Sequence, residues 1–307
     1  MGNESNKRLA GLALIKEAEL ETVKKKRPGD ISGEPAPKKT VKRLSRIFSS
    51  SYLVLILLFV YVPIVYLVLF SFNAGKSQTS FTGFSLRWYE SMFKDRTMLE
   101  SIYVTLIVAV ISTVVSTVLG TIAAIGLSKA RKLIRSAVIE INNLPVLNPD
   151  IVTAIGLMLL FMSIKLQGGM LTLILSHISF CVPYVILSVM PKLRQLDDNV
   201  AEAALDLGAT PFKALTRVII PQISPAILTG ALIAFSMSLD DFVVSYFNAS
   251  AGINTISMYV YSMKRYNLSV NAMSTLIVVT VTLVLVLANL IPWIKDKKAQ
   301  KEEPQNA

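Results

Sequence analysis

Apolar residues are gathered into six stretches, and this pattern limits the chain more than any other feature. Each stretch is about 20 residues long, the length that a helix needs to cross roughly 30 Å of hydrocarbon. The 307-residue chain is 53% hydrophobic and 17% charged, which is too apolar for a soluble protein of this length. We therefore predict an all-α membrane protein with six transmembrane helices, near residues 51–72, 102–127, 145–164, 167–190, 222–247 and 272–293.

The positions of the basic residues predict how these spans are oriented. The formal net charge is +11, but the charges are unevenly distributed along the chain. If the amino terminus is inside, the cytoplasmic segments hold 24 of the 31 Lys and Arg residues. Because cytoplasmic loops carry an excess of Lys and Arg, both termini are expected in the cytoplasm. The first apolar stretch lacks the short apolar core and cleavage site of a signal peptide, so we expect it to remain as the first span.

Composition divides the chain into three parts. Residues 1–46 are rich in lysine and proline and too polar to fold alone, so they predict a disordered, basic cytoplasmic arm. Residues 47–295 form the six-span domain, and residues 296–307 form a cytoplasmic tail. The arm is compatible with a solvated tail and with an amphipathic segment on an anionic lipid surface. The sequence leaves both interpretations open.

The cytoplasmic loop 197–221 carries the signals of two short helices with a tight bend. Gly208 is suited to end the first helix in a left-handed conformation, and Thr210 can cap the second helix with Pro211 in its first turn. Pro221 is expected to end the second helix, and Asp198 to cap the first. The second helix carries only two basic residues and is tethered to the membrane, which argues against binding to nucleic acid.

The first of these helices has a surface that fits close docking against another protein. Ala203 and Ala204, with Val200 and Leu207 at helical spacing, give a smooth ridge of small side chains, and Glu202 can meet a cation on a partner. The loop resembles the EAA motif of the permease subunits of ABC importers, with Glu202, Ala203, Ala204, Gly208 and Pro221 in register. Positions 218 and 220 carry Val and Ile, where the family pattern has Ile and Leu. The resemblance implies a loop that docks into a cytoplasmic ATPase and transmits its motion.

Other stretches are similar to the PotC-type permeases of spermidine/putrescine importers. They are GFSLRWYESMF, NPDIVTAIGLMLLFM, SHISFCVPYVILSV, AEAALDLGAT and SLDDFVVSYF, and the likeness runs over about residues 50–295. It implies the type I ABC importer (MetI-like) fold in a bacterial plasma membrane. It also implies a PotB-type permease partner, two PotA-type ATPases and an external PotD-type polyamine-binding protein. ATP and Mg²⁺ would act in the ATPases, and this chain would hold no cofactor and perform no catalysis.

Two adjacent carboxylates, Asp240 and Asp241, lie inside the fifth apolar stretch. Ionised Asp costs roughly 2.5–3.5 kcal/mol at the centre of a membrane helix, so such residues usually have a function. On one continuous helix, Ser238, Asp241 and Ser245 would form a polar strip beside apolar side chains. Carboxylates, hydroxyls and aromatic rings suit the ammonium groups and apolar stem of a polyamine. We therefore predict that Asp240, Asp241 and Ser238 line a substrate pathway.

Asp150 is a third acidic candidate in apolar surroundings, at the start of the third span. It is compatible with contact to the substrate, with an ion pair to a partner subunit and with capping of a broken helix after Pro149. His177 lies in the fourth span, four residues before Cys181. It is interpreted as a packed histidine of the core, and lining of the pathway by both residues is the alternative. His177 is the only histidine, and Cys181 is the only cysteine, so a typical zinc site is not expected.

Two alternatives to a polyamine importer remain open. One is an importer of the same type with another cargo, such as ferric ion, thiamine or sulfate. The other is a proton-coupled secondary carrier that works alone, which the ATPase-docking loop argues against.

Overall fold

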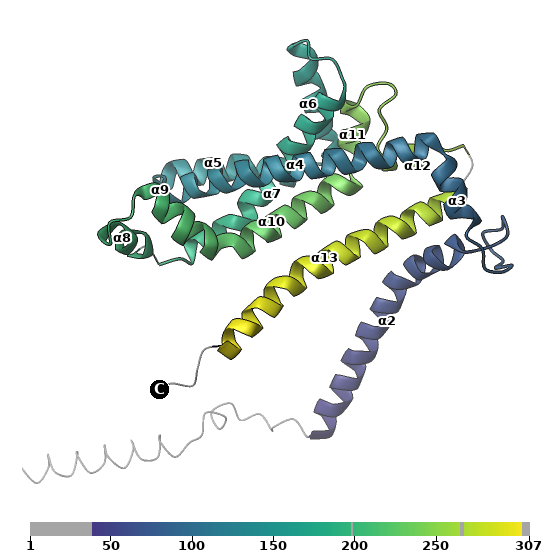
Figure 1. Cartoon of the computed structure of the whole chain (residues 1–307), viewed down its shortest axis with the longest axis horizontal. Helices are drawn as coiled ribbons and strands as arrows, with labels where there is room; N and C mark the ends of the chain where they lie inside the picture. The colour runs from purple at the N-terminus through teal and green to yellow at the C-terminus, as the bar shows by residue number, and fades with distance from the viewer. Residues whose placement is uncertain (1–38, 198, 265–266, 303–307) are drawn as a thin grey trace, which may run out of the picture. The chain divides into compact units, whose positions relative to one another are not determined.

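The computed structural model describes residues 39–197, 199–264 and 267–302 (Figure 1). The chain divides into two units, Met1–Ile64 and Val65–Ala307. In the first unit, the described residues belong to helix α2 (Lys39–Ser71), which continues into the second unit. The predicted arm lies largely outside the described residues, and α2 begins at Lys39 rather than at the expected boundary at residue 47.

The second unit is built from helices, and its described residues contain one isolated β-bridge, between Asn73 and Phe84. The helices are α3 (Arg87–Lys94), α4 (Arg96–Lys129), α5 (Lys132–Leu147), α6 (Asp150–Ser163), α7 (Met170–Arg194), α8 (Asn199–Asp206), α9 (Pro211–Ala214), the π-helix η1 (Leu215–Ile219), α10 (Ile220–Asp240), α11 (Val243–Asn248), α12 (Ile256–Ser262) and α13 (Ser269–Glu302). The all-α prediction is confirmed.

All six predicted spans correspond to helices, but they are not six straight spans. Among the described residues, four helices are long and apolar enough to cross a membrane, namely Tyr52–Ser71, Arg96–Lys129, Met170–Arg194 and Pro211–Asp240. A bent pair of helices corresponds to the third predicted span, and a shorter apolar helix, Ser269–Val284, to the sixth.

The third predicted span is a bent pair rather than one helix over residues 145–164. Helices α5 and α6 meet at an angle of 107°. The bend lies at Asn148 and Pro149, and Asn148 has an extended backbone with φ −81° and ψ 149°. The residue before a proline is driven out of the helical region by a clash with the proline ring. Pro149 therefore ends α5, and α6 starts afresh at Asp150.

The fifth predicted span is also broken, and it begins earlier than expected. The prediction of one helix over residues 222–247 is wrong, because α10 ends at Asp240 and α11 begins at Val243. At the other end, α9, η1 and α10 form one continuous helical segment of 30 residues, Pro211–Asp240. Such a segment is about 45 Å long. It joins the predicted coupling loop directly to the Asp240–Asp241 pair.

Pro221 does not end the second short helix, contrary to the prediction. The chain passes through the π-helical turn Leu215–Ile219 and continues as α10. A proline lacks the N–H of a helical hydrogen bond, and its ring clashes with the preceding turn. Wider π-turns inside helices accommodate such a local mismatch.

The core of the second unit is formed by α4, α7 and α10, which lie side by side (Figure 1). Val185 of α7 lies between two glycines, Gly120 of α4 and Gly230 of α10. A Cβ atom on Gly120 would lie 2.7 Å from Val185 Cβ, and one on Gly230 would lie 3.3 Å from Val185 Cα. Small residues allow such close helix packing in membranes. The two glycines therefore fix how closely α4 and α10 approach α7.

Candidate substrate site and coupling loop

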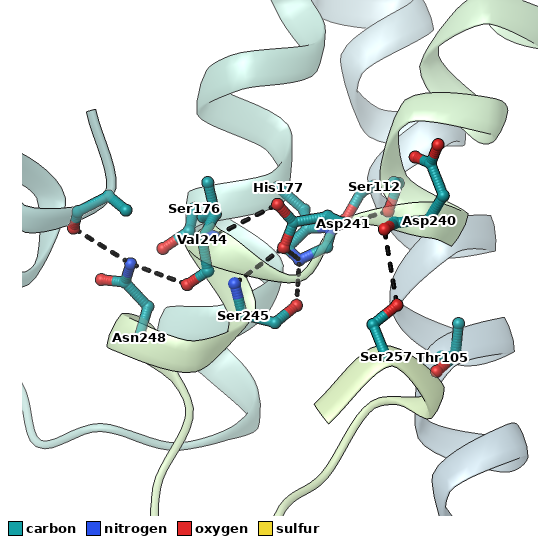
Figure 2. Close-up of polar contacts among 12 residues, drawn as sticks. Thr105, Ser112, Ser176, His177, Asp240, Asp241, Val244, Ser245, Asn248 and Ser257 are labelled. Atoms are coloured by element: carbon teal, nitrogen blue, oxygen red, sulfur yellow. Dashed lines mark hydrogen bonds and ion pairs between the residues drawn. The ribbon is translucent and has the colours of Figure 1, made fainter. Parts of the chain in front are cut away.

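The break between α10 and α11 is organised by the carboxylate of Asp241. Its Oδ1 accepts a hydrogen bond from the backbone N–H of Val244 at 3.2 Å, and its Oδ2 accepts one from Ser245 N–H at 2.7 Å (Figure 2). These are backbone donors of the first turn of α11, which have no partner within the helix. The side chain is only 10% exposed. Asp241 thus caps α11 from a position just before it, and it does not continue a helical strip.

His177 of α7 joins the two sides of the break. Its ring is 1% exposed. Nδ1 lies 2.7 Å from Ser238 Oγ at the end of α10, and Nε2 lies 3.1 Å from Ser245 Oγ on α11 (Figure 2). Nε2 also lies 3.6 Å from Asp241 Oδ2. The interpretation of His177 as a buried core residue is confirmed, and the ring in addition holds the segment that carries Asp241.

Further hydrogen bonds hold α11 against its neighbours. Asn248 donates from Nδ2 to the carbonyl of Ala154 on α6 at 3.2 Å, and its own carbonyl accepts from Thr172 Oγ1 on α7 at 2.8 Å. Ser257 of α12 donates to the carbonyl of Asp240 at 3.4 Å. The broken span is therefore held by α6, α7 and α12 together.

A pocket of about 310 Å³ lies at this break and brings the three predicted acidic residues together. Asp150 comes from the start of α6, Asp240 from the end of α10, and Asp241 from the segment that follows. Apart from Thr153, the rest of the lining is apolar or aromatic, and the described lining residues include no Lys, Arg or His; the other lining residues are Pro145, Thr153, Phe180, Tyr184, Met237, Phe242, Val243 and Val244. The pocket is thus acidic with aromatic walls, a combination that attracts organic cations.

The two adjacent aspartates have different surroundings. Asp241 is largely enclosed by the hydrogen bonds that cap α11, whereas Asp240 is exposed, and Figure 2 shows its carboxylate pointing away from His177. Ser238 is buried and bonded to His177, and it does not line the pocket. Asp150, like Asp240, is exposed. Asp150 and Asp240 are therefore the two carboxylates freest to meet a ligand.

A group of aromatic side chains lies beside the pocket. The ring of Phe242, which lines the pocket, lies 4.8 Å from Tyr261 of α12 and 5.5 Å from Tyr246 of α11. Tyr246 and Tyr261 are exposed. Phe242 and Tyr246 are four residues apart, the spacing of neighbours on a helix, whereas the contact between Phe242 and Tyr261 depends on tertiary structure.

The predicted coupling loop has the expected bend. Gly208 follows α8 with a left-handed φ of +81°, and Thr210 Oγ1 accepts a hydrogen bond from Lys213 N–H at 3.4 Å at the start of α9. Glu202 and Ala203 are exposed, and Ala204 is partly buried. The predicted cap of the first helix, Asp198, lies outside the described residues.

Two large apolar side chains lie exposed at the bend of the loop. Leu207 belongs to the predicted docking ridge, whereas Phe212 was not singled out from the sequence. Leu207 is 90% exposed and Phe212 is 73% exposed. Leu207 follows α8 and Phe212 lies in the first turn of α9, which Figure 1 shows at the opposite end of α10 from α11. Exposed apolar side chains around a rigid bend are typical of a surface that another protein covers.

In the described part of the chain, no group of three His, Cys, Asp or Glu side chains is arranged to hold a metal ion.

A protein-family comparison matches residues 116–299 to the binding-protein-dependent transport system inner membrane component. The match includes the coupling loop, Asp150 and the Asp240–Asp241 pair. It covers more than half of the chain.

Curated relatives agree with this match over most of their length. The chain is 36% identical over 253 residues to the putrescine transport system permease protein PotI of Escherichia coli K12, covering 80% of this chain and 89% of the relative. It is 33% identical over 251 residues to the spermidine/putrescine transport system permease protein PotC of Haemophilus influenzae, covering 81% and 98%. Both relatives are permease proteins of transport systems by name.

The fold is similar to that of a solved ABC importer. A chain of a bacterial ABC transporter that imports the acidic polysaccharide alginate superposes with a TM-score of 0.65. The match covers 88% of this chain and 100% of that chain at 17% sequence identity. At this identity the likeness supports the fold alone, and it confirms the expected fold of an ABC importer permease.

Proposed function

Because this chain belongs to the family of binding-protein-dependent transport system inner membrane components, we propose that it is the permease subunit of an ATP-driven polyamine importer. The family match and the apolar helices assign it to the plasma membrane as a multi-pass protein. Putrescine and spermidine are the cargoes in the names of its curated relatives. These names agree with the cargo that the pocket chemistry favours.

The observation that carries the proposal is the acidic, aromatic pocket at the break between α10 and α11. Asp150 and Asp240 offer exposed carboxylates to ammonium groups, and Phe180 and Phe242 offer ring faces and apolar surface to the methylene stem. Ammonium groups and methylene segments alternate along a polyamine, so the carboxylates and the aromatic walls of the pocket both contribute to its binding. A pathway for import also has to release its cargo, which favours exposed carboxylates over a fully enclosed ion pair.

The continuous helical segment from Pro211 to Asp240 supports the mechanism of coupling. One end carries the bend at Gly208 with its exposed apolar side chains, and the other end carries the carboxylate of Asp240 in the pocket. When ATP closes a docked ATPase pair, movement of the loop is transmitted along this segment to the pocket. Alternating access then results from motion of the helices, with no chemistry in this chain.

The proposal includes the partners that such a machine needs. A PotB-type permease completes the pathway, two PotA-type ATPases bind the coupling loops and hold ATP and Mg²⁺, and a PotD-type protein delivers polyamine from outside. The excess of Lys and Arg on one side, 24 of 31 residues, favours cytoplasmic termini and a cytoplasmic coupling loop.

The alternatives are less well supported. Sulfate is an anion, and an acidic pocket without a basic residue among the described lining residues repels it. Ferric ion and thiamine are cations and have to be tested as competitors. A proton-coupled carrier that works alone does not need the docking loop.

The test is uptake of labelled putrescine and spermidine by vesicles that contain the chain with its partners. We expect ATP-dependent uptake that excess unlabelled spermidine abolishes and that excess thiamine or ferric citrate leaves unchanged. Uptake driven by a pH gradient without ATPases would contradict the proposal, and so would uptake of thiamine or iron in place of polyamines.

A further inference from the structure

A second, larger pocket lies at the end of the helix bundle that carries the coupling loop. Its volume is about 670 Å³, and its walls come from the ends of α4 and α7, from the start of α5 and from the segment that leads into α8. It is well separated along α10 from the acidic pocket, which lies at the other end of that helix. The two pockets share no lining residue.

This second pocket is basic. Its lining includes Lys129, Lys132, Arg135 and Arg194, against two carboxylates, Glu140 and Asp197. Within the described ranges, the side chains of Lys132, Arg135 and Arg194 form no hydrogen bond or ion pair. Cations that converge on one cavity repel one another, and an anion between them relieves that repulsion. Two of the four are arginines, whose planar fork of N–H donors fits phosphate.

The surroundings indicate where such a phosphate comes from. The pocket lies at the ends of two membrane-spanning helices, α4 and α7, which is the level of the lipid headgroups. The neighbouring helix α5 exposes Leu133 (83%) and Ile134 beside the basic residues of the same turn. A ligand that joins a phosphate to apolar chains therefore finds partners for both parts, whereas a free phosphate uses only the basic part.

The geometry points to a binding site for the phosphate headgroup of an anionic phospholipid of the cytoplasmic leaflet. The assignment of this end to the cytoplasm rests on the proposed function. The headgroup lies between Arg135 of α5 and Arg194 of α7, and its acyl chains lie along the exposed apolar side chains of α5.

This site also touches the coupling loop. Asp197 and Val200, at the root of the loop, line the same pocket as Arg135 and Arg194. A bound headgroup therefore holds the root of the loop against the helix ends, and it favours the loop position in which these contacts form. Coupling between ATP hydrolysis and transport is expected to depend on anionic lipid.

The test uses the complete complex in nanodiscs of phosphatidylcholine mixed with phosphatidylglycerol, and native mass spectrometry of the lipids retained after transfer to detergent. The variant is Arg135→Gln combined with Arg194→Gln. The matched control, Arg87→Gln combined with Arg96→Gln, removes the same charges from residues at and near α3, at the other end of the bundle. We expect roughly 30-fold weaker retention of phosphatidylglycerol in the variant, at about five-fold for each basic residue. The control is expected to retain it like the unmodified chain.

Three results would overturn the assignment. The first is that the variant retains phosphatidylglycerol as well as the control does. The second is that inorganic phosphate at millimolar concentration displaces the lipid completely, which identifies a site for free phosphate. The third is that the variant keeps its lipid but loses its ATPases, which identifies a protein contact. Lipid retention is measured without cargo. If the complex fails to import polyamines, the proposed function fails while this measurement still reports on the lipid site.

Discussion

Asp241 Oδ2 lies 3.6 Å from His177 Nε2, beside the break that separates α10 from α11. The same ring contacts a serine on each side of the break. An imidazole from another helix therefore helps to hold the break that carries Asp240 and Asp241. His177 is a positioning residue in this arrangement, because it does not itself line the pocket.

Replacing His177 with alanine is expected to weaken polyamine transport without preventing assembly. The substitution removes two buried hydrogen bonds, each worth about 1 kcal/mol, so the binding-competent pocket becomes up to roughly 30-fold less populated and kcat/KM falls by up to the same factor. Most of the change is expected in KM for putrescine, because the pocket loses its shape while the coupling loop is untouched. His177→Gln is expected to recover part of the loss, since its amide can still bond a hydroxyl.

Cys181→Ala is the matched control for His177. Cys181 is buried one helical turn further along α7 and donates only to the carbonyl of Ala234, at 3.4 Å. It is expected to leave KM unchanged. Equal KM values in His177→Ala and Cys181→Ala would contradict the positioning role.

The two aspartates are expected to respond differently to substitution. Asp240→Asn removes an exposed carboxylate and is expected to raise KM for spermidine by about ten-fold, the loss of one charge-assisted bond, with little change in thermal stability. Asp241→Ala removes the cap of α11 and is expected to lower stability by about 1 kcal/mol. Uptake kinetics and thermal unfolding of the purified complex measure the two effects, and the reverse pattern would exchange the two roles.

The sequence predicted the parts of the fold that depend on neighbouring residues. The left-handed conformation of Gly208 and the cap at Thr210 follow from local rules for helix ends. The bend of the third span had a signal too, because Pro149 restricts the backbone of the residue before it. The amphipathic and apolar patterns also located every span to within a few turns.

The break in the fifth span could not be predicted in the same way. The residues around it, Asp240, Asp241 and Phe242, include neither glycine nor proline, so local rules favour a continuous helix. The break is stabilised by His177, which lies 61 residues before Ser238 in the chain. The cost of the carboxylates in an apolar stretch identified them as candidates, but their meeting in one pocket depends on tertiary structure.

A larger side chain at Gly120 is expected to destabilise the helix bundle. A Cβ atom there would lie 2.7 Å from Val185 Cβ, closer than packed side chains approach. Gly120→Val is therefore expected to cost about 1–3 kcal/mol, measured as a lower midpoint of thermal unfolding in detergent. Gly126→Val on the same helix is the control, because a Cβ at Gly126 meets no atom within 4 Å. Equal midpoints for the two variants would rule out the close approach of α4 and α7.

Phe212 is expected to contribute to ATPase docking and not to folding. Its side chain is 73% exposed, so Phe212→Ala removes little buried surface from this chain. If the ATPase covers it, as an aromatic residue at the centre of an interface, the affinity falls by roughly 30-fold. Phe93→Ala on α3 is the matched control, an exposed phenylalanine at the other end of the bundle. A pull-down of the ATPase with equal recovery for both variants would contradict the docking role.

Substitution of Gly208 tests whether the bend of the loop couples ATP hydrolysis to transport. Its φ of +81° is unfavourable for a β-branched residue by about 1–2 kcal/mol. Because a Cβ atom there would meet no atom within 4 Å, Gly208→Val introduces backbone strain and not a steric clash. We expect ATP hydrolysis to continue while polyamine uptake falls. Gly208→Asn is expected to keep coupling, because asparagine tolerates the left-handed region.

Gly252→Val is the control for strain alone. With φ +91° and equally open surroundings, it places similar strain in the loop before α12. If Gly252→Val uncouples the complex as strongly as Gly208→Val does, then strain itself, and not the docking loop, is responsible.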